Sequence, residues 1–196
     1  MKLFDTKIIS ISNQKGGVGK TTSSVNIATY LAASEIPTLI IDMDPQANST
    51  SGLGIEIQND IKSIYDVIIK EVSPEDAIQK TSLDYLDIIP SSSQLVGAEI
   101  ELVSEISREY MLKEALEKIK GKYKYIIIDS PPSLGLLTLN VLSASNSIII
   151  PIQCEYYALE GLSQLLNTIR LVQKRLNSKL EIEGILVTMY DSRLNL

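Results

Sequence analysis

The chain has 196 residues, of which 44% are hydrophobic, so one domain with a sizeable core is expected over residues 1–196. It contains no histidine and a single cysteine, Cys154. This excludes histidine-dependent catalytic triads, histidine-ligated zinc and internal disulfides, and makes the cytoplasm the expected compartment. The 18 basic and 24 acidic side chains give a net charge of −6, which argues against a protein that coats nucleic acid with its whole surface.

Short runs of isoleucine, leucine and valine alternate with segments of helical periodicity along the whole chain. The apolar runs predict strands at residues 7–12, 38–42, 86–90, 125–129, 147–152 and 184–189. The segments between them predict helices at residues 20–34, 61–70, 74–80, 94–105, 108–120, 136–145 and 159–177. Near-continuous apolar strands are typical of parallel sheets, so we expect an α/β fold with a doubly wound, mostly parallel sheet flanked by helices.

The longest uncharged stretch, residues 130–154, is long enough to cross a bilayer. It contains three prolines and several polar side chains, however, and is better explained as a strand end, a helix and another strand. The first residues carry an aspartate and run directly into the first predicted strand, so no signal peptide and no membrane partner are expected.

Residues 13–22, with the sequence NQKGGVGKTT, follow the first predicted strand and open the first predicted helix. In this context a glycine-rich loop turns several backbone N–H groups toward phosphate oxygens, Lys20 reaches the β- and γ-phosphates, and the Thr21 hydroxyl binds Mg²⁺. Gln14 stands where the standard phosphate-loop pattern has glycine, and Lys15 adds a second lysine. The alternative is a glycine-rich turn with incidental lysines.

Aspartates follow two further predicted strands at the carboxyl edge of the sheet, where ligands bind in such folds. Asp42 and Asp44 end the second strand, and Asp129 ends the strand at 125–129. An aspartate in this position beside a phosphate loop usually helps to hold Mg²⁺. Taken alone, each aspartate could equally cap the segment that follows it.

Four separated motifs occur in order: KGGVGKTT, DMDPQ, DSPPSLG and PIQCEYYALEGLSQL. Together they resemble the ParA/Soj-type chromosome and plasmid partition ATPases. That group shares a deviant Walker A phosphate loop (P-loop) with MinD and the nitrogenase iron protein. Gln14 and the PPSLG segment resemble the partition branch more than MinD, and the nitrogenase protein needs cysteines that this chain lacks. The resemblance implies a P-loop NTPase fold, with ATP and Mg²⁺ as cofactors.

The resemblance also assigns roles in nucleotide binding. ATP is sandwiched between two protomers of a homodimer, and Lys15 matches a lysine that crosses to the partner's phosphates. Lys20, Thr21 and Thr22 match the phosphate and Mg²⁺ contacts within one protomer. The complete expected nucleotide-binding set is Lys15, Gly16, Gly17, Val18, Gly19, Lys20, Thr21 and Thr22.

For hydrolysis, the resemblance makes Lys15, Lys20 and Asp44 the expected catalytic residues. Asp44 matches the residue that orients the attacking water. Asp129 matches the Mg²⁺-associated aspartate, expected to act through water, and Asp42 is a weaker candidate for electrostatic support. Phosphoryl transfer needs mainly positioning and charge neutralisation, so this set suffices without histidine.

Family members bind DNA without sequence preference as ATP-bound dimers, and a ParB/Spo0J-like partner stimulates hydrolysis. Arg193 matches a DNA-contacting arginine, and residues 162–196 carry five basic and three acidic side chains. The resemblance therefore implies association with the nucleoid, although an ordinary solvated helix face would carry the same charges. The segment with Gln153, Glu155 and Tyr156 matches a family signature near the nucleotide, where tyrosines can equally be structural.

Family members continue beyond the segment that matches Leu196, so the chain is expected to lack the family's C-terminal portion. The sequence leaves open whether it is a fragment or a shortened protein. Two rival functions also stay open. One is a MinD-like membrane-positioning ATPase, which would need an amphipathic helix near its C-terminus. The other is a non-catalytic nucleotide-dependent regulator.

Overall fold

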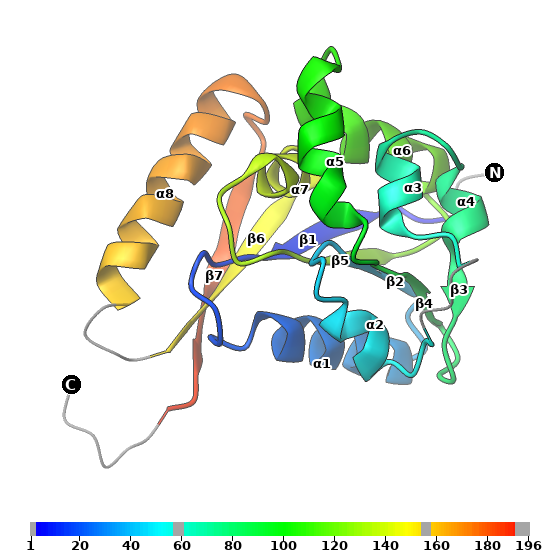
Figure 1. The fold of residues 1–196 in the computed structure, drawn as a ribbon. Coiled ribbons are helices and arrows are strands. Elements are labelled where there is room, and N and C mark those ends of the chain that lie inside the picture. Colours follow the sequence, from blue (N-terminus) through cyan, green and yellow to red (C-terminus); the bar gives the residue numbers. More distant parts are fainter. Residues whose placement is uncertain (1–2, 57–60, 154–157, 191–196) are drawn as a thin grey trace.

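The computed structural model describes residues 3–56, 61–153 and 158–190 (Figure 1). A seven-stranded sheet forms its centre, in the order β3-β4-β2-β5-β1-β6-β7. Only β3 is antiparallel to its neighbour; the other pairs are parallel. The strands are β1 (Lys7–Ile11), β2 (Thr38–Asp42), β3 (Gln79–Lys80), β4 (Leu86–Ile89), β5 (Tyr125–Asp129), β6 (Ser147–Gln153) and β7 (Glu181–Thr188).

Helices cover both faces of the sheet. One face carries α1 (Lys20–Ala33) and α2 (Asn48–Gly52), drawn below the sheet in Figure 1. The opposite face carries α3 (Ile64–Ile68), α4 (Pro74–Ala77), α5 (Leu95–Glu101), α6 (Met111–Ile119), α7 (Leu136–Ala144) and α8 (Ala158–Arg175). Two 3₁₀ turns, η1 (Leu102–Ser104) and η2 (Arg108–Tyr110), lie between α5 and α6. The predicted doubly wound α/β fold is thereby confirmed.

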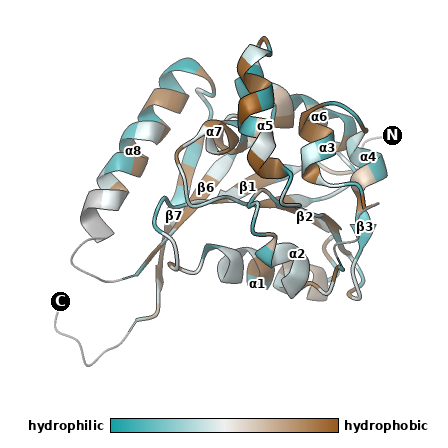
Figure 2. Ribbon diagram, in the orientation of Figure 1, coloured by the Kyte–Doolittle hydropathy of each residue, from teal (hydrophilic) through white to brown (hydrophobic). Residues whose placement is uncertain are grey.

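The central strands are apolar on both faces because each face packs against helices. On β2, Ile40 joins the core beneath α1, whereas Leu39 and Ile41 join the larger core on the opposite face. All three side chains are fully buried. Alternate residues therefore supply two different cores, which explains why these strands lack the polar alternation of a half-exposed sheet. Figure 2 shows hydrophobic residues along the strands and along α7, which is buried in the opposite-face layer.

The six predicted strands are all present, with ends that differ by up to three residues. The predicted helix at 74–80 is wrong in its second half. It ends at Ala77, and Gln79–Lys80 pair with β4 as the antiparallel edge strand β3. The short helix α2 was not predicted, and the predicted helix at 61–70 is reduced to α3. In the part of the chain that the structure describes, no helix is long and apolar enough to cross a membrane.

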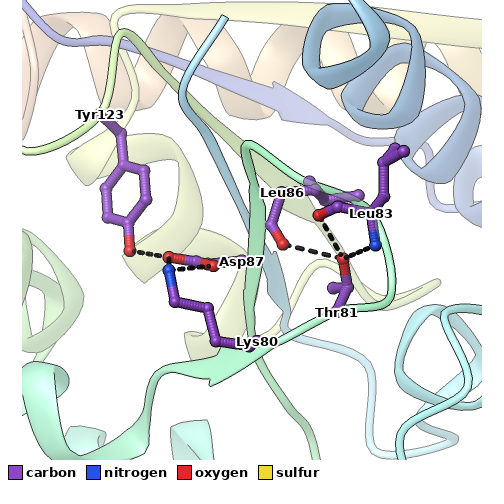
Figure 3. A network of polar contacts seen from close by, with 6 residues as sticks. All are labelled: Lys80, Thr81, Leu83, Leu86, Asp87 and Tyr123. Atoms are coloured by element: carbon purple, nitrogen blue, oxygen red, sulfur yellow. Dashed lines mark hydrogen bonds and ion pairs between the residues drawn. The ribbon is translucent and has the colours of Figure 1, made fainter. Parts of the chain in front are cut away.

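A polar network fastens β3 to the body of the sheet (Figure 3). Asp87 on β4 is 7% exposed, and both of its carboxylate oxygens lie 2.9 Å from Lys80 Nζ. The buried Tyr123 hydroxyl donates to Asp87 Oδ2 at 2.7 Å. In the β3–β4 turn, the Thr81 hydroxyl donates to the Leu86 carbonyl at 2.8 Å. These contacts hold a two-residue strand that would otherwise have little pairing of its own.

Candidate functional site

The glycine-rich loop joins the end of β1 to the start of α1, at the carboxyl edge of the sheet. Gly17 and Gly19 have φ angles of +75° and +84°, in the left-handed region where a side chain is strained. The loop is held from the side by β7, because the Thr188 hydroxyl donates to the Val18 carbonyl at 2.9 Å and to the Ile152 carbonyl at 3.1 Å. Neighbouring strand ends therefore set the position of the loop.

Asn13 fixes the entry to the loop. Its buried side-chain amide donates to the Pro151 carbonyl at 2.7 Å, and its Oδ1 accepts from the Lys15 backbone N–H at 3.0 Å. One side chain thus connects the end of β6 to the first lysine of the loop. No sequence motif indicates a role for Asn13; the one signal is its position directly after a buried strand.

Lys20 begins α1 and is 7% exposed. Its Nζ donates to the Lys15 carbonyl at 3.1 Å, so the ammonium group lies beneath the loop. Burial lowers the pKa of Lys20, while the nearby charges of Asp129 and Asp44 act in the opposite direction. A phosphate placed in the loop would add further negative charge beside this ammonium group and favour its charged form.

Asp129 ends β5 and is fully buried. Its carboxylate accepts from the Ser49 hydroxyl at 2.7 Å and from the Ser24 hydroxyl at 3.1 Å, and it is also hydrogen-bonded to the Thr21 side chain. Burial raises the pKa of Asp129, and these hydrogen bonds oppose the rise. The structure therefore brings together the two residues predicted to lie near Mg²⁺, Thr21 and Asp129.

Asp42 ends the adjacent strand β2 and is also fully buried. Its Oδ2 accepts from the Thr50 backbone N–H at 2.8 Å and from the Thr50 hydroxyl at 2.7 Å. Its Oδ1 accepts from the Asp44 backbone N–H at 3.1 Å. Burial raises the pKa of Asp42 to about 6. Asp42 thus organises the segment that leads from β2 into α2. Both oxygens of its carboxylate accept hydrogen bonds from Asp44 and Thr50.

Asp44 lies two residues further along and is 7% exposed. Its Oδ1 accepts from the Gln46 backbone N–H at 2.9 Å. It lines a cavity of about 330 Å³ together with Lys20 and Thr21. The other lining residues are Gly16, Gly17, Gly19, Thr22, Gln46, Asn48, Pro132 and Met189. Most of the predicted nucleotide-binding residues therefore meet in one cavity with Asp44.

Lys15 lines a second, larger cavity of about 630 Å³ that borders the same loop. Gln14, Gln153 and Gln164 line it as well, and Pro132 contributes to both cavities. The two lysines of the loop, Lys15 and Lys20, therefore line different cavities. Arg193, Glu155, Tyr156, Tyr157 and Cys154 lie outside the described residues.

The residues of the smaller cavity fit a magnesium–phosphate ligand. Backbone N–H groups of a glycine-rich loop at a helix N-terminus bind phosphate, and Lys20 supplies a positive charge. Thr21 in the cavity, and the Asp129 carboxylate buried behind it, carry oxygen atoms of the kind that Mg²⁺ prefers. Mg²⁺ usually keeps several waters and substrate oxygens in its shell. Among the described residues no group of three or more histidine, cysteine, aspartate or glutamate side chains could hold a metal ion.

Several residues that shape the site could not be recognised from the motifs. Ser24, Ser49 and Thr50 all donate to the buried aspartates. Serine and threonine are common at helix starts and in loops for local reasons, so their composition gives no specific signal. Their role becomes visible only when α1 and α2 are placed against the strand ends.

Known proteins resemble this chain in sequence over most of its length. A protein-family model described as an AAA domain matches residues 6–182. The chain is 60% identical over 190 residues to the sporulation initiation inhibitor protein Soj of Bacillus subtilis (strain 168), covering 97% of this chain and 75% of Soj. It is 54% identical over 190 residues to the chromosome partitioning protein ParA of Myxococcus xanthus (strain DK1622), covering 97% of this chain and 67% of that protein.

Solved structures show the same fold. A crystal structure described as cobyrinic acid a,c-diamide synthase from Mycobacterium smegmatis with bound ADP and magnesium is 41% identical to this chain, with a TM-score of 0.92. The similarity covers 96% of this chain and 77% of that chain. The fold is therefore that of a P-loop NTPase. The sequence matches to Soj and ParA extend over almost the whole chain, which belongs to the ParA/Soj family of partition ATPases.

Proposed function

We propose that this protein is an Mg²⁺-dependent ATPase that dimerises on ATP, binds DNA without sequence preference and drives chromosome or plasmid partition. The observation that carries the proposal is the convergence of Lys20, Thr21 and Asp44 on one cavity beneath a glycine-rich loop, with Asp129 behind them. The relatives named Soj and ParA support the partition role. The ADP and magnesium bound by the Mycobacterium smegmatis protein support the choice of cofactors.

Within one protomer, the loop from Gly16 to Gly19 and the ammonium group of Lys20 would hold the phosphates. Thr21 would bind Mg²⁺ directly and Asp129 through water. When bound, Mg²⁺ neutralises charge on the phosphate oxygens and helps to align them. The hydroxyl groups of Ser24 and Ser49 keep the Asp129 carboxylate in place, so this part of the site is organised by the folded chain itself.

Asp44 would orient the attacking water. Its carboxylate is held by the Gln46 backbone N–H, and its own backbone N–H is held by Asp42. Because hydrogen bonds fix both its backbone and its carboxylate, Asp44 would lose little conformational freedom when water binds. This favours Asp44 as a positioned general base.

Lys15 would complete a second active site across a homodimer interface. It lines the larger cavity, whereas Lys20 lines the smaller one, and Pro132 borders both. Two lysines that serve different spaces fit a nucleotide sandwiched between two protomers. The proposal extends to Arg193 as a contact to DNA phosphates, to a ParB/Spo0J-like partner that stimulates hydrolysis, and to a location in the cytoplasm on the nucleoid. These three parts rest on family membership.

The decisive experiment compares Asp44→Ala with Lys20→Ala. Asp44→Ala should bind ATP as the parent does, because Lys20 and the loop remain. It should hydrolyse ATP more slowly by a factor of about 10² to 10⁴, which is the usual contribution of a positioned base. Lys20→Ala should lose ATP binding itself, because the ammonium group beneath the loop is gone. Calorimetry measures binding, and phosphate release measures turnover.

Parent-like turnover by Asp44→Ala would show that something other than Asp44 positions the water. Unchanged ATP affinity in Lys20→Ala would contradict the assignment of the phosphate site. If the parent bound ATP but showed no turnover with or without DNA, the chain would be a nucleotide-dependent regulator and not an ATPase.

A further inference from the structure

Helix α5 and the turn that follows it leave an apolar surface uncovered. The helix and the turn pack against the larger core through Leu95 and Ala98 of α5 and Leu102 of η1, which are at most 1% exposed. On its opposite side, Val96 and Ile100 are 63% and 77% exposed. The segment stands out from the helical layer at the top of Figure 1, and Figure 2 shows hydrophobic residues along it.

The same surface continues beyond α5. Val103 in η1 is 61% exposed, and Ile106 in the following turn is 89% exposed. Residues separated by three or four positions share one face of a helical segment, so Val96, Ile100 and Val103 form a continuous line. Ile106 follows in the turn after η1. We call these four residues the α5 ridge. An outer helix face normally carries polar residues, and a contiguous apolar patch of this kind marks an interaction site.

Carboxylates border the α5 ridge on both sides. On the helix, Glu99 and Glu101 lie on opposite flanks of the line through Ile100. Beside Glu101 lies a groove of about 380 Å³, whose lining includes the apolar side chains of Ile68, Leu102 and Met111. The charged residues of the groove are Lys70, Glu71, Glu101 and Glu105. The surface is therefore apolar along its centre and mainly acidic along its border.

Two cationic side chains that adjoin this surface are engaged within the protein. Lys70 Nζ lies 3.2 Å from Glu114 Oε2, and Arg108 donates to the Val103 carbonyl at 2.8 Å. Arg108 also lies beside Glu109, with Nε 3.4 Å from Oε1. Glu71 and Glu105 are both exposed. An incoming positive charge would therefore meet more negative than positive charge at this border.

We propose that the α5 ridge is the docking surface for a basic amphipathic helix of a partner protein. Leucine-type side chains of that helix would cover Val96, Ile100, Val103 and Ile106. Lysine or arginine side chains would lay their aliphatic stems in the groove and place their charges beside Glu101 and Glu105. A second copy of this chain fits less well, because its acidic border would face an identical acidic border. The inference does not depend on the nucleotide site.

The test uses a fluorescein-labelled synthetic peptide with leucine at the apolar positions of a 3.6-residue repeat and lysine elsewhere. Its binding to the full chain is followed by fluorescence anisotropy without nucleotide. Ile100→Ser should weaken binding at least about tenfold, since one buried aliphatic side chain contributes that much. Ile100 is exposed, so this substitution should leave the circular dichroism melting curve unchanged. The matched control is Leu171→Ser on α8, where Leu171 is 59% exposed.

Charge is tested separately. Glu105→Gln should weaken peptide binding and reduce its dependence on salt, because one contact between opposite charges is removed. Glu35→Gln, at an exposed glutamate just after α1, should change neither. Equal affinity of the peptide for the parent and for Ile100→Ser would overturn the proposal. So would sedimentation that shows the parent, but not Ile100→Ser, to self-associate without nucleotide, since the α5 ridge would then bind a second copy.

Discussion

The three aspartates of the site have different surroundings, and these suit them to different tasks. Asp42 and Asp129 are fully buried and accept hydrogen bonds from α1, α2 and the segment between β2 and α2. Asp44 retains some exposure and lines the cavity. The motif DMDPQ indicates that two acidic residues end a strand, but it cannot distinguish the one that holds the β2–α2 segment from the one that lines the cavity. That distinction depends on Thr50, which approaches Asp42 only in the folded chain.

The raised pKa of Asp42 predicts a pH-dependent contribution to stability. In metal-free buffer its folded-state pKa of about 6 exceeds the ordinary value of 3.8, so the folded protein holds this proton more tightly than the unfolded chain. The contribution of Asp42 is therefore fully present below pH 3.8 and is lost as the pH rises to about 6. Asp42→Asn lacks it. The free energy of unfolding of the parent, minus that of the variant, should fall across this window.

Urea unfolding at a series of pH values measures that difference. Above the window, the difference should stay level, because Asp42 is then ionised in both states. Parallel pH profiles for the parent and Asp42→Asn would show that the pKa of Asp42 is not raised in the folded protein.

Among the secondary-structure elements, the hydrophobic pattern of the sequence predicts the central strands of the sheet but not its edge strand β3. The central strands are recognisable because burial on both faces requires long apolar runs, as in β5. The edge strand β3 contains only Gln79 and Lys80, which carry no strand signal. Its pairing depends on Asp87, which belongs to another strand, and on Tyr123, which lies far away in the sequence. A local pattern cannot contain that information.

Tyr123→Phe should destabilise the protein by about 1–3 kcal/mol, the usual effect of losing a hydrogen bond to a charged group. The substitution removes the hydroxyl that donates to Asp87 and leaves that buried carboxylate with Lys80 as its remaining side-chain partner in Figure 3. Burial, together with the neighbouring Asp87, raises the pKa of Tyr123, so the hydroxyl stays a neutral donor. Urea unfolding at neutral pH measures the loss.

The control for this substitution is Tyr30→Phe on α1, where Tyr30 is 76% exposed. It should change stability by less than about 0.5 kcal/mol, as most surface substitutions do. If both variants unfolded at the same urea concentration as the parent, the network around Asp87 would contribute nothing to the attachment of β3.

In the whole molecule, the glycine-rich loop borders two cavities. The sequence motif predicts most residues of the smaller cavity but few of the larger one. The strand–loop–helix context is enough to place Lys20 beneath the glycine-rich loop, because backbone geometry alone positions it at the start of α1. The larger cavity beside Lys15 is formed by residues from β6, α8 and the segment after β5, which are brought together by the topology of the sheet. Occupation of that cavity by a second protomer would depend on the dimer interface, which the loop motif does not describe.

Lys15→Ala tests the proposed assembly directly. Each protomer keeps Lys20, the glycine-rich loop and Thr21, so affinity for a non-hydrolysable ATP analogue should remain close to that of the parent. The charge proposed to reach the partner's phosphates is lost, so the analogue should no longer produce dimers in light scattering. Lys124→Ala is the matched control: Lys124 is exposed just before β5, at the opposite end of the strands from the loop. An equal dimer fraction in Lys15→Ala and the parent would mean that Lys15 does not act across the interface, and joint loss of binding and dimerisation would place it in its own protomer's phosphate site.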